Sequence, residues 1–340
     1  MDSVTQIALG AAVGEAALGH RVGWRAATWG GICGLLPDLD VLWPFADPVA
    51  AFTWHRGYSH SLAALILATP IIAWAAVRVH PDTRAYRRGW LLLVFLALVT
   101  HPLLDCFTVY GTQVLLPFSD IPVGWSTIFI IDPAFSVPVI FGVLSARVLR
   151  RTPSLGRRLN GAGLAIGVAW LAFTVGAKAH VDRVAADSLP VGVTRYLTTP
   201  APFNAILWRV VAMTEDGRYA EGYHSLLDAE PRVAFVWRPD GHDLLDPLRL
   251  ERQVARLVWF SRGFFAAREL ASGEILLSDL RMGLEDRFVF SFVVGRRVGD
   301  AVEPVPAFRR PDLPVPPGIW GAIWERILDR SPHPACLLTC

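Results

Sequence analysis

Acidic and histidine side chains stand out in the first half of this sequence, because the residues around them are mostly apolar. His101 and Asp105 are four residues apart, so in a helix both project from one face and can share one ion. Asp38 and Asp40 flank a single leucine at the end of an apolar run, in a turning or extended stretch that Pro37 favours. Ionisable groups within apolar segments are costly and often functional. The predicted metal ligands are Asp38, Asp40, His55, His60, His101 and Asp105.

This mixture of carboxylate and imidazole ligands suits Zn²⁺, Mn²⁺ or Fe²⁺ better than it suits an all-oxygen calcium site. We expect one ion, or two ions bridged by a carboxylate, with Zn²⁺ as the leading candidate. Such ions lower the pKa of a bound water and stabilise the oxygens of a displacement, often at phosphorus. The ligand types therefore favour a metal-dependent hydrolase.

Three further residues could complete the predicted site. Asp2 and Asp132 could each add a ligand or act as a general base, although an Asp at a helix end is often only a cap. Arg56 could bind an anionic group of the substrate or pair with a carboxylate. His55 is interpreted either as a further ligand or as a group that supports the ligands.

The composition predicts that the elements carrying these residues lie in a membrane. Hydrophobic residues make up 53% of the chain and charged residues 18%, against about 25% charged in a soluble protein. A bilayer core needs roughly 20 apolar residues in helical form, and segments that approach this length all precede residue 178. The sequence predicts an all-α membrane bundle of about six transmembrane helices, at residues 3–19, 25–46, 61–78, 89–109, 127–146 and 159–177.

The distribution of arginine predicts how this bundle is oriented. Arginines cluster in the loops near residues 20–25, 78–88 and 147–158, whereas the loop 47–60 has only Arg56 and the loop 110–126 has none. The positive-inside rule places the arginine-rich loops in the cytoplasm. Every predicted ligand then lies on the outer side, together with the chain after residue 178. In a bacterium that side is the periplasm.

Residues 179–340 are predicted to form an extracytoplasmic α+β domain. Strand-like alternation occurs at residues 232–238 and 287–294, and apolar residues at helical spacing occur within 248–265. The net charge is +2, and the sequence has no basic stripe with interleaved aromatic residues. We therefore expect no nucleic-acid partner, and expect the membrane and a lipid or lipid-linked substrate instead.

Four ordered motifs resemble those of the YdjM family, a group of bacterial inner-membrane proteins for which a metal-dependent hydrolase activity is inferred. They are Met1–Gln6, Leu36–Asp40, His55–Ser61 and Thr100–Asp105. The resemblance covers about residues 1–180, and Thr199–Asp228 is similar to a C-terminal extension of some members. It implies a multi-pass protein of the bacterial inner membrane. The ligand types are also similar to those of zinc phospholipase C and P1-type nucleases, which implies phosphoester cleavage at the membrane surface.

Three functions remain open at this point. The first is a hydrolase that cleaves a lipid or lipid-linked substrate at the outer leaflet, with the outer domain covering the site. The second is a metal-ion or proton transporter, which would need polar residues through the depth of the bundle rather than at one end. The third is an assembly or binding protein whose metal only stabilises the bundle, and a closed, fully ligated site would favour it.

Overall fold

The computed structural model describes residues 1–285, 287–310, 317–328 and 337, which form two compact units. The helical unit contains Met1–Trp43, Trp54–Val175 and Pro202–Asn204. The C-terminal unit contains Pro44–Thr53, Gly176–Ala201 and Ala205–Cys340. The domain boundary predicted at residue 178 therefore falls inside a continuous helix, Pro153–Ser188.

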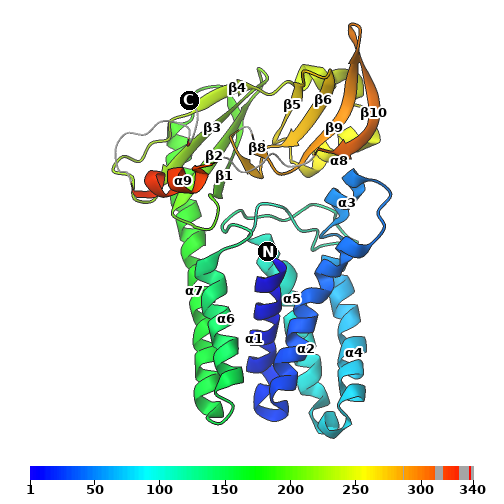
Figure 1. Ribbon diagram of the computed structural model, residues 1–340, viewed down its shortest axis with the longest axis vertical. Helices are drawn as coiled ribbons and strands as arrows, with labels where there is room; N and C mark the ends of the chain where they lie inside the picture. The colour runs from blue at the N-terminus through cyan, green and yellow to red at the C-terminus, as the bar shows by residue number, and fades with distance from the viewer. Residues whose placement is uncertain (286, 311–316, 329–336, 338–340) are drawn as a thin grey trace. The chain divides into compact units, whose positions relative to one another are not determined.

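The helical unit consists mainly of apolar helices (Figure 1), with short 3-10 turns between some of them. Asp2 begins the first helix, because its carboxylate accepts a hydrogen bond from the backbone nitrogen of Thr5. Along the chain the elements are α1 (Ser3–Val22), α2 (Trp24–Leu35), η1 (Leu36–Leu42), η2 (Tyr58–His60), α4 (Leu62–Val79), η3 (Pro81–Tyr86), α5 (Arg87–Cys106), α6 (Pro133–Val148) and α7 (Pro153–Ser188).

Three helices among the described residues are long and apolar enough to cross a membrane, and they confirm three of the predicted spans. They are α4, the stretch Pro81–Cys106 that contains α5, and α7. The predicted span 25–46 is wrong as one helix, because α2 ends after 12 residues and the chain continues as η1 from Leu36. The predicted span 127–146 begins late, since α6 starts at Pro133 and has 16 residues.

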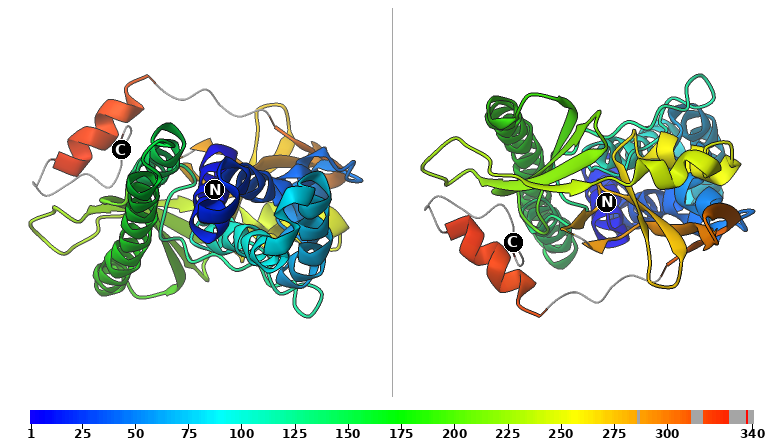
Figure 2. Two further views of the ribbon diagram at one scale, coloured as in Figure 1. Left: turned by 90° about the horizontal axis from the view of Figure 1, so that it is seen from below. Right: turned by 90° about the horizontal axis from the view of Figure 1, so that it is seen from above.

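Helix α1 lies in the middle of the bundle and contacts α2, α5 and α6 (Figure 2). Small residues let α1 and α2 approach closely. A side chain at Gly30 of α2 would overlap the backbone carbonyl of Gly10 in α1, and one at Gly14 would overlap the carbonyl of Ala26. Close backbone contact of this kind replaces the hydrophobic effect as the source of helix association in a membrane. It also fixes the end of α2, from which η1 continues.

The C-terminal unit is an α+β fold with two antiparallel four-stranded sheets, which confirms the predicted class. The first sheet has the order β1-β2-β3-β4, with β1 (Val193–Pro200), β2 (Leu207–Thr214), β3 (Arg218–Ser225) and β4 (Val236–Pro239). The second has the order β10-β9-β6-β5, with β5 (Phe265–Glu269), β6 (Glu274–Asp279), β9 (Ser291–Val298) and β10 (Ala301–Arg309). The remaining elements are α3 (Pro48–Trp54), η4 (His242–Leu248), α8 (Arg252–Phe260), the short pair β7 (Gly283–Leu284) and β8 (Arg287–Phe288), and α9 (Ile319–Leu328).

Strand β2 forms the centre of this unit because both of its faces are covered. Val210 packs with Val184 and Ala185 from the end of α7. Its neighbour Val211 packs on the other side with Phe264 and Leu280. A strand buried on both faces is apolar almost throughout, as the sequence of β2 is.

The contact between α1 and α2 generates a stability prediction. Gly30→Ala should destabilise the helical unit by about 1–3 kcal/mol, because the added methyl group forces the two backbones apart. The measurement is the thermal unfolding of the full chain in detergent. Gly161→Ala is the matched control, since nothing lies within 4 Å of its added methyl group and alanine favours a helix. Equal stability of the two variants would contradict the packing described for α1 and α2.

Candidate metal centre

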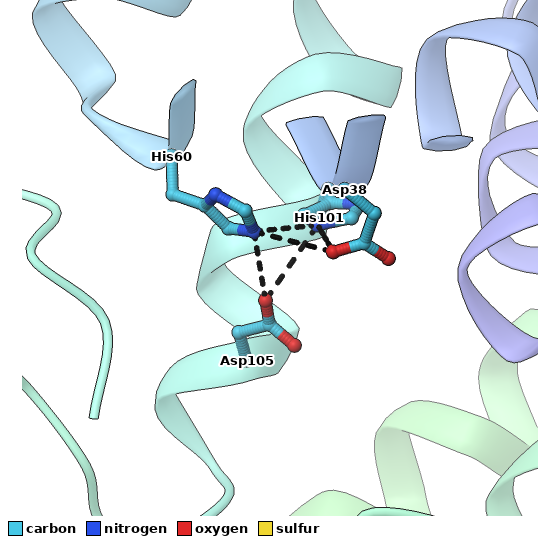
Figure 3. A group of neighbouring side chains, drawn as sticks. All are labelled: Asp38, His60, His101 and Asp105. Atoms are coloured by element: carbon cyan, nitrogen blue, oxygen red, sulfur yellow. Dashed lines mark hydrogen bonds and ion pairs between the residues drawn. The ribbon is translucent and has the colours of Figure 1, made fainter. Parts of the chain in front are cut away.

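Four of the predicted ligands meet at one end of the helical unit. They are Asp38 of η1, His60 of η2, and His101 and Asp105 of α5 (Figure 3). His101 and Asp105 lie one helical turn apart on the same face of α5, as their spacing predicted. The 3-10 turn that follows α2 presents Asp38, and a second 3-10 turn presents His60 immediately before α4.

The distances from the two imidazoles to each other and to the two carboxylates are close to those around one metal ion. His60 Nε2 lies 3.1 Å from His101 Nε2, and it lies 3.4 Å from both Asp38 Oδ1 and Asp105 Oδ2. His101 Nε2 lies 3.3 Å from Asp38 Oδ1 and 3.6 Å from Asp105 Oδ2. An ion with four bonds of about 2.0–2.1 Å in tetrahedral geometry sets its ligand atoms about 3.3–3.4 Å apart. The expectation of a second ion remains a prediction.

Hydrogen bonds outside the cluster fix which nitrogen of each imidazole faces inward. His101 Nδ1 lies 2.7 Å from the carbonyl oxygen of Gly34, which can only accept, so Nδ1 carries the proton. Ser59 Oγ donates to Asp40 and therefore accepts from His60 Nδ1, at 2.9 Å. In the neutral rings both Nε2 atoms thus present lone pairs to each other and to two carboxylates. Four acceptors that converge in this way could hold a metal ion among them.

Asp105 is held so that one of its oxygens is left for this cluster. Its Oδ1 contacts the α-amino group of Met1, accepts from Gln6 Nε2 at 3.1 Å, and lies 3.3 Å from Arg56 Nη2. Its Oδ2 is buried and receives no hydrogen bond from any residue that the structure describes. A buried carboxylate oxygen without a donor is unfavourable unless a cation satisfies it.

The four side chains are almost completely buried. His60 and Asp105 have no exposed surface and His101 has 1%, whereas Asp38 has 9%. Charges interact more strongly where water is excluded, so burial would strengthen the hold of these side chains on a metal ion. Asp38 is therefore the ligand nearest to solvent, and access to the cluster is on its side.

Asp40 and His55 lie beside the four ligands and contact each other. Asp40 Oδ1 is 2.7 Å from His55 Nδ1, and Asp40 Oδ2 accepts from Ser59 Oγ at 2.6 Å. Burial raises the pKa of the Asp40 carboxyl, but the hydrogen bonds from His55 and Ser59 outweigh it and hold that pKa below its ordinary value. The charged carboxylate orients Ser59 and, through it, the ring of His60. Asp40 and His55 were predicted as direct ligands. This arrangement instead favours a role in which they support the ligands.

Arg56 is buried and supports Asp105. Its Nη1 donates to Thr108 Oγ1 at 3.0 Å, its Nη2 faces Asp105, and its guanidinium lies 4.8 Å from the ring centre of Tyr110. The φ angle of Arg56 is +64°, a conformation that costs a non-glycine residue about 1–3 kcal/mol. Of the two predicted roles, the pairing with a carboxylate is the one that the structure shows.

Asp2 and Asp132 each cap a helix and lie outside the group of four. Asp2 caps α1, and Asp132 caps α6 through the backbone nitrogens of Ala134 and Phe135 while accepting from Trp170 Nε1 at 3.0 Å. Their predicted role in catalysis remains a prediction.

Sequence reasoning did not assign Ser59, Thr108 or Tyr110 to the site. The sequence positions of the first two could have suggested their roles, because Ser59 precedes His60 and Thr108 lies three residues after Asp105. No local pattern marks Tyr110.

A family model described as "YdjM inner membrane protein" matches residues 1–181, which is more than half of the chain. An uncharacterised protein of Bacillus subtilis (strain 168), YfhP, is 30% identical over 144 residues. That match covers 39% of this chain and 42% of YfhP, so the chain spans less than half the length of this relative. No solved structure gives a significant match to the chain.

The convergence of lone pairs predicts that the purified chain binds a divalent cation. The measurement is a titration of the full chain in detergent with Co²⁺, followed by its visible absorption. His101→Ala should weaken binding more than about a hundredfold, since losing a ligand costs more than losing a supporting residue. Asp132→Asn is the control and should bind as the wild type does. A wild-type chain with no affinity for Co²⁺ or Zn²⁺ would sink the assignment.

The positions of Asp38 and Asp40 predict unequal effects for the same substitution. Asp38→Asn should abolish strong Co²⁺ binding, whereas Asp40→Asn should weaken it only about 10–100-fold, the usual effect of a residue that orients a ligand. Parallel titrations of the two variants provide the comparison. If Asp40→Asn proves the more damaging, Asp40 is a direct ligand.

Proposed function

This chain belongs to the YdjM inner membrane protein family, and we propose that it is a metal-dependent hydrolase. The proposed reaction is cleavage of a phosphoester or related bond in a lipid or lipid-linked substrate, at the outer face of the inner membrane. Asp38, His60, His101 and Asp105 would hold the metal. Zn²⁺ is the proposed ion because two imidazoles and two carboxylates suit it, with Mn²⁺ and Fe²⁺ as alternatives.

One observation carries the proposal. Two imidazole lone pairs and two carboxylate oxygens face one another, and all four ligand atoms lie within 4.8 Å of one another. A divalent metal held there would lower the pKa of a bound water and would stabilise negative charge that develops on a phosphoryl oxygen.

The residues around the ligands would keep the site ordered during a reaction. Arg56 and Gln6 hold Asp105 Oδ1, so that Oδ2 keeps its direction. Ser59 and the carbonyl of Gly34 keep both imidazole Nε2 atoms turned inward. A site that is organised in advance does not have to reorganise as charge develops. Substrate would approach on the side of Asp38, the ligand with the most exposed surface.

The position of the site along the candidate spans supports a lipid substrate. Asp105 lies one residue before the end of α5, and His60 lies two residues before the start of α4. Both helices are candidate membrane spans. Their ends at this level would lie near lipid head groups, where a phosphoester is within reach. The arginine-rich connections α1–α2, α4–α5 and α6–α7 lie at the opposite end of the bundle (Figure 1), which supports an outward-facing site and a periplasmic C-terminal domain.

A second function, a metal-stabilised assembly or binding protein, is favoured by one feature of the site. Four protein ligands fill a tetrahedral shell, and structural zinc sites are closed in this way, whereas catalytic zinc sites keep a position open. Hydrolysis at this cluster requires a fifth position on the ion.

The hydrolase proposal predicts activity that depends on the ligands. The full chain in detergent, loaded with Zn²⁺ or Mn²⁺, should cleave bis(p-nitrophenyl) phosphate or release phosphate-containing head groups from phosphatidylglycerol vesicles. His101→Ala should lower the rate at least about a hundredfold, because the metal and its activated water are lost. Gly161→Ala should leave the rate unchanged.

Azide added to the Co²⁺-loaded chain separates the two functions. An open position should bind azide and change the visible spectrum, whereas a closed site should not respond. Strong metal binding without an azide response and without activity would replace the hydrolase by the metal-stabilised binding protein.

A further inference from the structure

Large apolar side chains are exposed in and directly after η1, the element that also carries Asp38. Val41, Leu42 and Trp43 are all exposed, Leu42 to 76%. Asp38 is the ligand with the most exposed surface. Apolar side chains therefore project from the same short stretch of chain that carries the most accessible ligand.

A second group of exposed apolar residues lies in the loop between α5 and α6. Phe118 is 89% exposed, and Leu115 and Ile121 are exposed as well. Single exposed apolar residues are common on proteins, but a group of large ones marks a surface that meets another apolar phase. We call the two groups together the apolar rim, which consists of Val41, Leu42, Trp43, Leu115, Phe118 and Ile121.

Hydrogen bonds within the helical unit fix both parts of the rim to the start of α4. Asp40 of η1 accepts from Ser59 Oγ at 2.6 Å, and Ser59 lies in η2, shortly before α4. In the loop, the carbonyl oxygen of Val114 accepts from the backbone nitrogen of Leu62 at 3.0 Å. Leu62 is the first residue of α4. The rim therefore lies at the level at which α4 begins.

The length of α4 places this level at the edge of the hydrocarbon core. Its 18 residues span about 27 Å at about 1.5 Å per residue, slightly less than a hydrocarbon core of about 30 Å. The opposite end of α4 is followed by His80, Asp82 and Arg84, which are unsuited to hydrocarbon. The remaining apolar length is supplied at the rim, where Leu115 and Phe118 lie close to the first turn of the helix.

Lipid is the occupant that fits this surface. The rim continues the exposed apolar surface of α4, a candidate membrane span to which Leu67 and Ile71 belong. Trp43 has the side chain that is most typical of the boundary between hydrocarbon and head groups, because its ring is apolar and its N–H is polar. None of the six rim side chains is charged, which suits hydrocarbon chains.

We propose that the rim lies in the outer leaflet and that the substrate of the metal centre is a lipid that reaches Asp38 from the bilayer, with its hydrocarbon chains against η1. This inference rests on the proposed hydrolase function and narrows its substrate. A lipid presented in this way moves only its head group to the metal centre, and its chains do not have to enter water. A phosphoester without hydrocarbon chains gains nothing from the rim.

Nitroxide labels test the contact with lipid without any need for catalysis. Leu42→Cys and Phe118→Cys are labelled separately in the full chain, with Cys336 and Cys340 replaced by serine, since the other two cysteines are buried. The chain is reconstituted in phosphatidylglycerol vesicles. The measurement compares collisions of each label with oxygen, which concentrates in lipid, and with a water-soluble nickel chelate. Oxygen should collide more often than the chelate at both positions.

Two reference positions calibrate these labels. Leu67→Cys in α4 represents lipid, and Glu215→Cys in the exposed turn between β2 and β3 represents water. Both rim positions should resemble Leu67. A preference for the chelate, as at Glu215, would overturn the lipid contact. Labels that neither reagent reaches would also overturn it, because the C-terminal unit or a second copy of the chain would then cover the rim.

Cleavage of two substrates tests the route to Asp38. Leu42→Ser should lower the ratio of the rate on phosphatidylglycerol vesicles to the rate on soluble bis(p-nitrophenyl) phosphate about tenfold, because contact between one leucine and hydrocarbon contributes about that factor. Its affinity for Co²⁺ should match that of the wild type. Leu250→Ser is the matched control, since Leu250 is an exposed leucine of the C-terminal unit, and it should leave the ratio unchanged.

The outcomes separate this inference from the proposed function. A wild-type chain that cleaves the soluble substrate but not the vesicles would overturn the lipid route and leave the hydrolase intact. Equal loss on both substrates in Leu42→Ser would also overturn the route, since the change would then act on Asp38 itself. A wild-type chain that cleaves neither substrate overturns the proposed function and the route together, whereas the labels still decide the lipid contact. If Leu42→Ser fails to fold, Phe118→Ser takes its place.

Discussion

Electrostatic repulsion among four acceptors is the constraint on which the helical unit depends. His60 and His101 direct their Nε2 lone pairs toward Asp38 and Asp105 in a place almost without water. With the imidazoles neutral, only the carboxylates of Asp38 and Asp105 are like charges, and at about 4 Å two like charges repel by about 4 kcal/mol even at a moderate effective dielectric constant. A divalent cation held by the four ligands would offset this repulsion. Metal binding and the local fold are therefore expected to be coupled, with each favouring the other.

The surrounding structure can be understood as the means of holding these four groups against that repulsion. The close contact between α1 and α2 fixes the end of α2, whose Gly34 carbonyl accepts from His101 Nδ1. Met1, Gln6 and Arg56 all engage the outer oxygen of Asp105. Asp40 reaches His60 through Ser59. Three of the four ligands, His60, His101 and Asp105, thus have a partner outside the cluster, and such supporting contacts set both the direction and the basicity of a ligand.

The sequence predicted the parts of this arrangement that follow from local periodicity. His101 and Asp105 lie on one face of α5 because helical geometry places residues four apart together. Asp38 and Asp40 were predicted as equivalent ligands, and here local periodicity was insufficient. In the 3-10 turn η1, the Asp38 carboxylate faces the imidazoles while that of Asp40 faces His55 and Ser59. Whether Asp38 or Asp40 faces the imidazoles depends on tertiary contacts with η2, which local periodicity around η1 does not show.

Long-range organisation explains the other differences from the sequence predictions. The apolar run 25–46 looks long enough to span a membrane, but Pro37 follows closely on the end of α2 and the chain turns. The membership of α3 in the C-terminal unit depends on aromatic rings more than 200 residues away, such as Phe260 and Phe292. No pattern near Phe52 could indicate these partners.

The most direct measurement of the central claim is anomalous X-ray diffraction from crystals grown with Zn²⁺, recorded on both sides of the zinc absorption edge. The account predicts an anomalous peak within bonding distance of Asp38, His60, His101 and Asp105. A map without a peak there, or with the peak at Asp40 and His55 instead, would contradict it.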